Sequence, residues 1–259
     1  MAEQPGAQHR LWLRSFHRPT PGAPRLICLP HAGGSASFYF GLSRALSPAV
    51  EVLAVQYPGR QDRYDEPLAG SIQELARGVF HALGESDGTP PVLFGHSMGA
   101  MVGFELARLL QAAGRPPALF FASGRRGPSL VRTETVHQGD DATLIAEVTK
   151  LDGTDAALLE DEELLRMVLP VLRADYRAVE TYRRVPGPRL SCPVVAMTGD
   201  ADPRVSLDEA RTWAEETEGG FELRVFPGAH FYLVAAQEAV LAEVRTALRR
   251  LGPAAGASV

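Results

Sequence analysis

Short apolar runs and amphipathic stretches alternate along the first half of the chain. A continuous apolar run of a few residues is typical of a strand buried on both faces of a sheet, and apolar positions three and four apart predict a helix. Because such strands and helices follow each other in turn, we expect a parallel sheet with helices on both faces. The predicted strands are residues 25–29, 50–57, 92–94 and 118–122, and the predicted helices are 38–46, 71–83 and 100–113.

The first 24 residues precede this pattern and are rich in proline and glycine, which interrupt regular elements. The short apolar stretch Leu11-Trp12-Leu13 stands out there. We therefore expect a loose N-terminal segment that adds one short strand to an edge of the sheet.

The alternation stops between about residues 127 and 188, where no buried strand is predicted. A helical insertion between two late strands of a parallel sheet lies above the carboxyl ends of the strands, where sites form. We interpret it as a lid that shields a site from water and lines a pocket, with Met167 and Tyr176 among the walls. A plain helical subdomain is the alternative. The predicted helices are 142–150, 160–169 and 171–184, with joints at Leu151-Asp152-Gly153 and Pro170.

Strands and helices resume after the insertion. The small residues of the last segment, 252–259, are expected to be disordered. The chain is therefore expected to form one α/β domain, with a core at about 1–126 and 189–251 and a lid at about 127–188. The later predicted strands are 193–197 and 221–226, and the later predicted helices are 207–216 and 237–251.

Composition excludes several classes of protein. The 259 residues are 45% hydrophobic with a net charge of -5, and the arginines are scattered among acids, which argues against a nucleic-acid binder. No apolar run is long enough to cross a membrane and the N-terminus has no signal-peptide pattern, so a cytoplasmic protein is expected. Cys28 and Cys192 lie in or beside apolar runs and are expected to be buried free thiols.

The pentapeptide Gly95-His96-Ser97-Met98-Gly99 joins a predicted strand to a predicted helix. A Gly-X-Ser-X-Gly turn in this context presents the serine hydroxyl as a nucleophile, and the two glycines give room for a sharp, strained reversal. The Met98 N–H and the start of the helix would then lie beside a developing oxyanion.

The segment His31-Ala32-Gly33-Gly34-Ser35 follows the first buried strand. It has neither the Gly-X-Gly-X-X-Gly spacing nor the lysine of a phosphate loop. In a chain with a serine elbow, this position supplies the second N–H of an oxyanion hole, and Ala32 is the candidate donor. An ordinary glycine turn is the alternative. His31 is expected to order the loop rather than to act as a base.

A serine nucleophile needs an imidazole to take its proton and a carboxylate to hold the imidazole. His230 follows the last predicted strand, and Asp200 and Asp202 follow the strand before it. Asp202 is preferred because it lies further beyond the strand end, while Asp200 is suited to bonding local N–H groups. The order Ser97, Asp202, His230 along the chain is that of α/β-hydrolases.

Several motifs in order along nearly the whole chain resemble the type II thioesterases that accompany polyketide and nonribosomal peptide synthetases, a branch of the α/β-hydrolase fold. The matching motifs are Leu29-Pro30-His31-Ala32-Gly33-Gly34-Ser35, Gln56-Tyr57-Pro58-Gly59-Arg60, Gly95-His96-Ser97-Met98-Gly99, Ser123-Gly124-Arg125-Arg126, Leu172-Arg173-Ala174-Asp175-Tyr176 with Glu180-Thr181-Tyr182, Gly199-Asp200-Ala201-Asp202-Pro203 and Gly228-Ala229-His230-Phe231.

The resemblance implies an editing enzyme of antibiotic biosynthesis that hydrolyses short or aberrant acyl groups from the phosphopantetheine arm of acyl or peptidyl carrier proteins. By the same resemblance Ser97 would form the acyl-enzyme, His230 would act as base and then acid, and Asp202 would orient it. It implies no metal and no bound cofactor, since phosphopantetheine belongs to the substrate, and a monomer is expected. A general carboxylesterase, or a non-catalytic binding module on the same fold, is the alternative.

Four arginines carry two competing expectations. The loop that holds Arg60, Asp62, Arg63 and Asp65 is interpreted as a solvated surface. Alternatively, Arg60 and Arg63, together with Arg125 and Arg126, would meet an acidic carrier protein.

Overall fold

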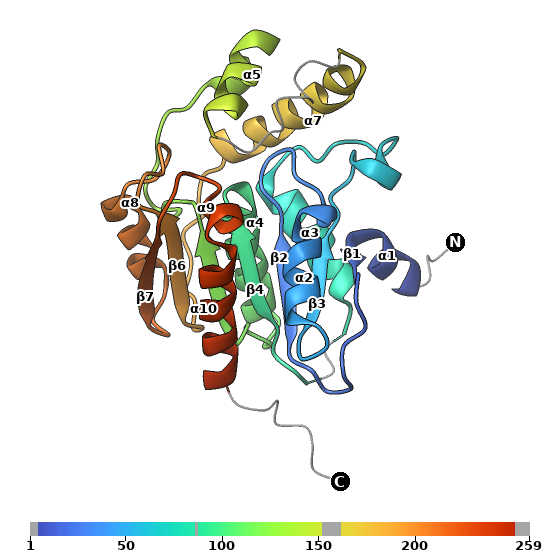
Figure 1. Cartoon of the computed structure of the whole chain (residues 1–259), viewed down its shortest axis with the longest axis vertical. Coiled ribbons are helices and arrows are strands. Elements are labelled where there is room, and N and C mark those ends of the chain that lie inside the picture. Colours follow the sequence, from blue (N-terminus) through green and yellow to red (C-terminus); the bar gives the residue numbers. More distant parts are fainter. Residues whose placement is uncertain (1–4, 86–87, 152–161, 252–259) are drawn as a thin grey trace.

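A seven-stranded sheet organises the molecule in the computed structural model, which describes residues 5–85, 88–151 and 162–251 (Figure 1). The strand order is β1-β3-β2-β4-β5-β6-β7; β1 is antiparallel to β3, and all other neighbours are parallel. This is the predicted α/β-hydrolase sheet. The strands are β1 Leu13–Arg14, β2 Arg25–Leu29, β3 Glu51–Val55, β4 Val92–His96, β5 Leu119–Ser123, β6 Val194–Gly199 and β7 Phe221–Phe226.

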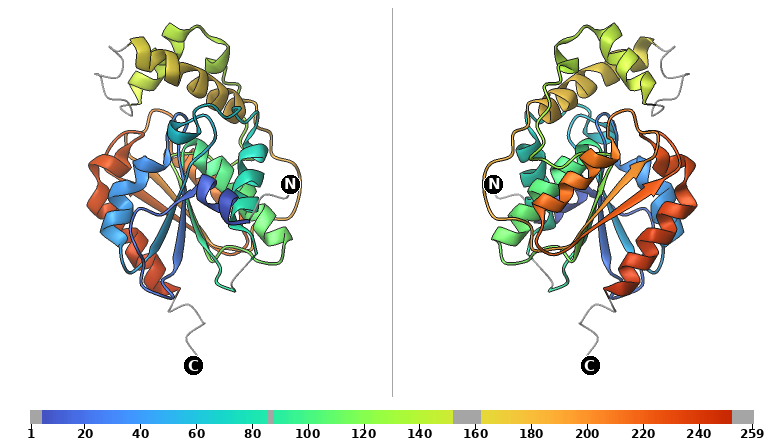
Figure 2. Two further views of the ribbon diagram at one scale, coloured as in Figure 1. Left: turned by 90° about the vertical axis from the view of Figure 1, so that its right-hand side faces the viewer. Right: turned by 90° about the vertical axis from the view of Figure 1, so that its left-hand side faces the viewer.

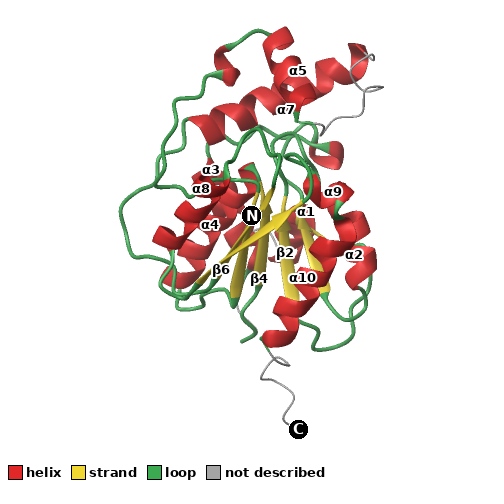
Figure 3. Ribbon diagram, turned by 60° about the vertical axis from the view of Figure 1, so that its left-hand side comes forward, coloured by secondary structure: helices red, strands yellow, loops and turns green. Residues whose placement is uncertain are grey.

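Helices cover both faces of the sheet, as Figures 2 and 3 show. The helices α3 and α4 pack on one face, and α2 and α10 pack on the other. The described helices are α1 Pro5–Trp12, α2 Phe40–Leu46, α3 Ile72–Leu83, α4 Met98–Ala112, α5 Asp141–Lys150, α7 Glu162–Glu180, α8 Leu207–Arg211, α9 Tyr232–Ala235 and α10 Gln237–Arg250, with 3-10 turns at Ala36–Tyr39, Gln61–Arg63, Val136–Gln138 and Thr212–Glu216.

The core lies in two layers because side chains of one strand alternate between the faces of the sheet. On β2, Ile27 and Leu29 join the layer under α3 and α4, whereas Leu26 and Cys28 join the layer under α2 and α10. Both faces are covered, which explains why this strand reads as an uninterrupted apolar run. Cys28 and Cys192 are buried free thiols, as predicted, and burial raises the pKa of the Cys192 thiol to about 12.

The N-terminal segment differs from its prediction in one respect. The short edge strand is present, with Leu13 opposite Val55 of β3, but the residues before it form helix α1 instead of a loose segment. Trp12 explains why this segment is ordered as a helix. Its ring lies against Gly78 of α3, and the guanidinium of Arg63 lies over the ring, 4.5 Å from its centre. Tertiary contacts thus override the weak local signal of a proline-rich stretch.

The helices α5 and α7 of the insertion, of which residues 127–151 and 162–188 are described, lie above the carboxyl ends of the strands (Figure 1). The predicted joint at Pro170 is wrong, since α7 runs through this residue without interruption. Pro170 has no N–H to donate to a carbonyl in the preceding turn of α7. Pro170 is on the exposed side of the helix, where water can bind that carbonyl. Leu172 and Tyr176 anchor the next turns against Leu144 of α5.

Some predicted features fall on parts of the chain that the structure does not describe. These are the joint at 152–153, the first residues of the helix predicted from 160, and the tail at 252–259. Within the described ranges, none of the helices has both the length and the apolar character needed to cross a bilayer.

Candidate active site

Ser97 occupies a strained turn between β4 and α4. Its φ and ψ are 54° and -115°, in a region that side-chain-bearing residues rarely adopt. A Cβ on Gly95 would overlap the backbone of Gly99, and a Cβ on Gly99 would overlap the carbonyl group of Leu29 at the end of β2. The two glycines therefore allow the elbow to form and to pack against the strand that leads into the His31–Ser35 loop.

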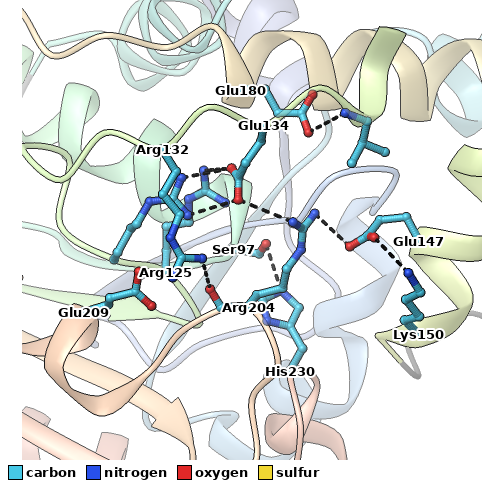
Figure 4. Close-up of polar contacts among 12 residues, drawn as sticks. Ser97, Arg125, Arg132, Glu134, Glu147, Lys150, Glu180, Arg204, Glu209 and His230 are labelled. Carbon is cyan, nitrogen blue, oxygen red and sulfur yellow. Dashed lines mark hydrogen bonds and ion pairs between the residues drawn. The ribbon is translucent and has the colours of Figure 1, made fainter. Parts of the chain in front are cut away.

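His230 joins Ser97 to a carboxylate. Its Nε2 lies 3.0 Å from Ser97 Oγ, and its Nδ1 lies 2.9 Å and 3.1 Å from the two oxygens of Asp202 (Figure 4 shows the Ser97–His230 contact). The side chains of His230 and Asp202 are 3% and 0% exposed, so water does not compete for this contact. A neutral imidazole with Nδ1–H donating to Asp202 leaves Nε2 free to accept the serine proton.

The structure separates the two aspartates that the sequence left as alternatives. Asp202 bonds His230 and also accepts the Arg204 N–H at 2.8 Å. Asp200 instead accepts the Gly228 N–H at 2.9 Å, which ties the loop after β6 to the loop that carries His230. The geometry thus gives Asp200 the local bonding role and places Asp202 beside the imidazole.

The two candidate oxyanion donors start from different elements and flank the elbow. Met98 is the first residue of α4, where a helix provides no acceptor for its own N–H. Ala32 lies in the loop after β2, and its N–H donates no hydrogen bond to any of the described residues. The close packing of Gly99 on Leu29 and Pro30 brings these two elements together.

His96 is buried beside His230, and His31 is half-buried next to His96. Burial, with the nearby His230 and His31, lowers the pKa of His96 well below its usual value, and burial, with His230 and Arg60, lowers that of His31 to about 3. The His31 ring packs against the rings of Phe38 and Phe231, with centroid distances of 4.6 and 4.8 Å, whereas the hydrogen bond to Ser97 comes from His230. These ring contacts fit the expected role of His31 in ordering its loop.

A polar chain behind the elbow was not predicted. His96 Nδ1 lies 2.8 Å from Ser123 Oγ, which lies 2.6 Å from the hydroxyl of Tyr232, two residues after His230. The chain connects the elbow, the end of β5 and the histidine loop. Sequence spacing holds no signal for it, because the three residues come from separate elements, the ends of β4 and β5 and the start of α9.

The loop expected to be a solvated surface is exposed at Asp62 and Asp65 but not at its arginines, and the expected arginine patch for a carrier protein is wrong. Arg60, Arg63, Arg125 and Arg126 are 4–8% exposed, so they are neither a solvated surface nor a free patch for an acidic partner. Their guanidinium groups bind acids within the chain instead, because a buried charge is stable only when it is paired. Arg60 pairs with Asp175, Arg63 with Glu66, and Arg125 and Arg126 with Glu134.

Glu134 is the centre of an ion-pair cluster between the insertion and the acid loop, which is the segment 200–204 after β6 (Figure 4). Its carboxylate lies 2.9 Å from Arg126 and 3.4 Å from Arg204, and Arg204 also reaches Glu147 of α5 at 3.0 Å. Burial opposes ionisation of Glu134, but the hydrogen bond from Arg126 and the adjacent cationic groups outweigh it and lower the pKa. Arg204 thus connects the insertion to the segment whose backbone bonds Asp202.

The expected pocket walls lie in different environments. Tyr176 is 5% exposed and packs within the insertion, whereas Met167 is 40% exposed on α7. In the described part of the chain, no group of three or more His, Cys, Asp and Glu side chains has the arrangement of a metal site.

Known proteins resemble this chain over most of its length. The model of the thioesterase domain family matches residues 24–248. The chain is 49% identical to the probable cadicidin biosynthesis thioesterase of Streptomyces griseus, over 94% of this chain and 68% of that protein. It is 51% identical to thioesterase PikA5 of Streptomyces venezuelae, over 86% and 80% of the two chains.

A solved structure agrees with these sequence matches. The type II thioesterase BorB from the borrelidin biosynthetic cluster superposes with a TM-score of 0.86 at 51% identity. The superposition covers 92% of this chain and 98% of that one.

Proposed function

Since this chain belongs to the thioesterase family, we propose that Ser97, His230 and Asp202 are its catalytic triad and that it hydrolyses acyl thioesters through an acyl-enzyme at Ser97. The observation that carries the proposal is the continuous contact from Ser97 Oγ through His230 to Asp202. An unassisted serine hydroxyl is a weak nucleophile at neutral pH, and this contact is what activates it.

In the first half-reaction, His230 Nε2 takes the proton of Ser97 Oγ as this oxygen attacks the thioester carbonyl carbon. The C–S bond then breaks, the sulfur leaves with its electron pair, and the thiol is released with the proton that His230 returns. A serine ester of the acyl group remains.

In the second half-reaction, His230 takes a proton from water, and the resulting oxygen nucleophile attacks the ester carbonyl carbon. The C–O bond to Ser97 breaks, and His230 returns the proton to Oγ, so the products are a carboxylic acid and the free enzyme. Asp202 holds the imidazole in one tautomer and stabilises its charged form in both steps.

The Ala32 and Met98 N–H groups are proposed to bind the oxygen that becomes negative in both tetrahedral intermediates. Two fixed donors, with the N-terminus of α4 behind one of them, stabilise this charge without reorganisation of solvent. One such donor contributes roughly 3–4 kcal/mol to the transition state in serine hydrolases.

The proposed substrates are short or aberrant acyl groups on the phosphopantetheine arm of acyl or peptidyl carrier proteins. Support comes from relatives that are named as thioesterases of cadicidin and borrelidin biosynthesis. The phosphopantetheine belongs to the carrier protein, so the proposed reaction uses no cofactor of the enzyme. Removal of such groups would edit a polyketide or nonribosomal peptide synthase in the cytoplasm.

The insertion, residues 127–188, is proposed to act as the lid of this site. It lies over the strand ends that carry Ser97 and His230, and it contacts the acid loop through Arg204. A cover in this place limits access of water to the acyl-enzyme.

The proposal is tested with one acyl group presented on a carrier protein and, in a matched assay, on nitrophenol. We expect the carrier thioester to have the higher kcat/KM and the Ser97→Ala variant to lack both activities. A strong preference for the nitrophenyl ester would instead identify a carboxylesterase. Hydrolysis that survives in Ser97→Ala would exclude the proposed nucleophile.

A further inference from the structure

The insertion is bonded directly to the loop that carries Ala32. Asp175, on α7, accepts the Gly33 N–H through Oδ2 at 2.8 Å. This carboxylate also pairs with the guanidinium of Arg60, and the side chains of both residues are 5% exposed. A residue 142 positions away in sequence thus holds the peptide that follows Ala32.

Arg60 binds the same loop from its other side. Its Nε donates to the Gly34 carbonyl at 3.2 Å, and its Nη1 donates to the Pro58 carbonyl at 2.8 Å. Asp175 and Arg60 therefore form one buried pair that contacts both Gly33 and Gly34. Neither group takes part in the proton transfers described above.

The loop itself is a tight turn that selects one backbone conformation. The Gly34 N–H donates to the His31 carbonyl at 2.9 Å, and Gly33 has a φ of +75°. This is the pattern of a type II turn with Ala32 and Gly33 at its centre, whose central N–H points outward. Asp175 accepts that outward N–H, so it favours this turn over the alternative with the central peptide reversed.

Apolar contacts also connect the insertion to the turn at Ala32 and Gly33. Ala32 packs against the cluster of Leu144, Leu172 and Tyr176 in the insertion, and a Cβ on Gly33 would overlap the side chain of Leu172. The turn is therefore held by α7 through both a charged and an apolar contact.

We propose that Asp175 is a positioning residue that couples the seating of α7 to the formation of the oxyanion hole. With α7 seated, the turn is fixed and the Ala32 N–H has one direction; with α7 displaced, the turn loses its anchor and the donor loses its alignment. The coupling rests on the proposed function, because it assigns Ala32 to the oxyanion hole. It makes the enzyme fully active only when its cover is in place.

The test is Asp175→Asn, which keeps the size of the side chain. The same oxygen of Asp175 binds the Arg60 guanidinium and the Gly33 N–H, so the amide leaves one uncharged oxygen for both partners and removes the charge that pairs with Arg60. We expect kcat to fall about 10- to 100-fold with little change in KM, because the lost alignment matters in the transition state. A boronic acid that forms a tetrahedral adduct on Ser97 should lose affinity by a similar factor. An uncleavable amide analogue of the acyl-phosphopantetheine should bind as it does to the wild type.

Asp141→Asn is the matched control. Asp141 pairs with Arg173, two residues before Asp175 on α7, but this pair does not touch the turn. We expect the control to change neither the boronate affinity nor kcat by more than about twofold, since the pair is partly exposed.

Arg60→Lys and Arg60→Gln provide a second pair of variants, in case Asp175→Asn does not fold. The lysine retains the charge beside Asp175 and should retain most of the boronate affinity, whereas the glutamine should lose about tenfold or more.

Two results would overturn the coupling: an unchanged boronate affinity in the folded Asp175→Asn and Arg60→Gln variants, or an equal loss for the boronate and the amide analogue. A failure of the proposed function would be recognised separately, because the wild type itself would then prefer oxygen esters or be inactive. The comparison of boronate affinities would still show whether the turn is held by Asp175.

Discussion

The sheet and the insertion meet at the loop that follows β2 but are held in place by different contacts. The strands around Ser97 are buried on both faces by apolar side chains. The insertion combines a small apolar cluster of its own with ion pairs, and of its described residues only Ala178, Val179 and Tyr182, at the end of α7 and just after it, join the core of the sheet. Apolar burial is insensitive to charge, while ion pairs respond to salt and to single neutral substitutions. The reacting groups thus belong to a frame held by apolar burial, and the charged contacts of the cover can be removed separately.

Removal of the nucleophile should have the largest effect and should leave both regions folded. In Ser97→Ala we expect kcat to fall about 10⁶-fold, as for other serine enzymes that lose this hydroxyl. The φ of 54° is strained for serine and alanine alike, so the unfolding midpoint should stay near that of the wild type. Hydrolysis assays and thermal denaturation check the two outcomes.

The two aspartates should differ by orders of magnitude. Asp202→Asn is expected to lower kcat about 10⁴-fold, because an amide does not hold the imidazole in the productive tautomer. Asp200→Asn keeps an oxygen that can accept the Gly228 N–H and should change kcat less than about tenfold. Equal losses in steady-state assays of the two variants would contradict the assignment of Asp202.

Acid should weaken the sheet before it weakens the ion pairs of the insertion. The pKa of buried His96 is lowered, so the unfolded chain binds a proton near pH 6.5 that the folded chain does not. The free energy of unfolding should therefore fall as the pH drops below about 6.5, by up to about 1.4 kcal/mol per pH unit for this residue.

Glu134 is an acid rather than a base, and its contribution to stability is lost at a lower pH than that of His96. Its pKa is lowered from 4.5, so its stabilising contribution is present above that pH and is lost only as the pH falls further. Hydrogen exchange at pH 7 and pH 5, corrected for the intrinsic rate, should show faster exchange in β4 at pH 5 and little change in α5 and α7. His96→Gln should reduce the pH dependence of the unfolding free energy; an unaltered slope would contradict the account.

A smaller effect is expected where the insertion meets the acid loop. Glu147→Gln removes the pair with Arg204, and both side chains are 16–19% exposed, so a loss of about 1 kcal/mol is expected. Hydrogen exchange should rise in 141–150 and not in the strands. The control Lys150→Gln removes a 4.0 Å pair from a side chain that is 70% exposed and should have almost no effect. Equal changes in the two variants would count against the ion-pair fastening.

The sheet could be predicted because its strands carry a local signal. The run Arg25–Leu29 and the run Phe221–Phe226 have the predicted bounds, and the serine elbow is recognisable because two glycines must flank a strained residue. Ser97, Asp202 and His230 could be nominated because parallel strands end at one edge, which places the loops after them side by side.

What sequence could not show is how distant residues pair. Arg60 and Asp175 lie 115 positions apart, and nothing in either neighbourhood indicates that they form a buried pair. For the same reason the arginines were interpreted as surface groups, and Pro170 as a break, since the contacts of Leu172 and Tyr176 that hold α7 are invisible in the local pattern.

The measurement that tests the account most directly compares two kcat/KM values for one acyl group. The ratio is that of the thioester on the phosphopantetheine of a carrier protein to that of the nitrophenyl ester. Intact-protein mass spectrometry of the enzyme during turnover accompanies it. The account predicts a ratio well above one, a mass increase equal to the acyl group on Ser97, and neither activity nor adduct in Ser97→Ala. A ratio below one, or an adduct and turnover that persist in Ser97→Ala, would contradict it.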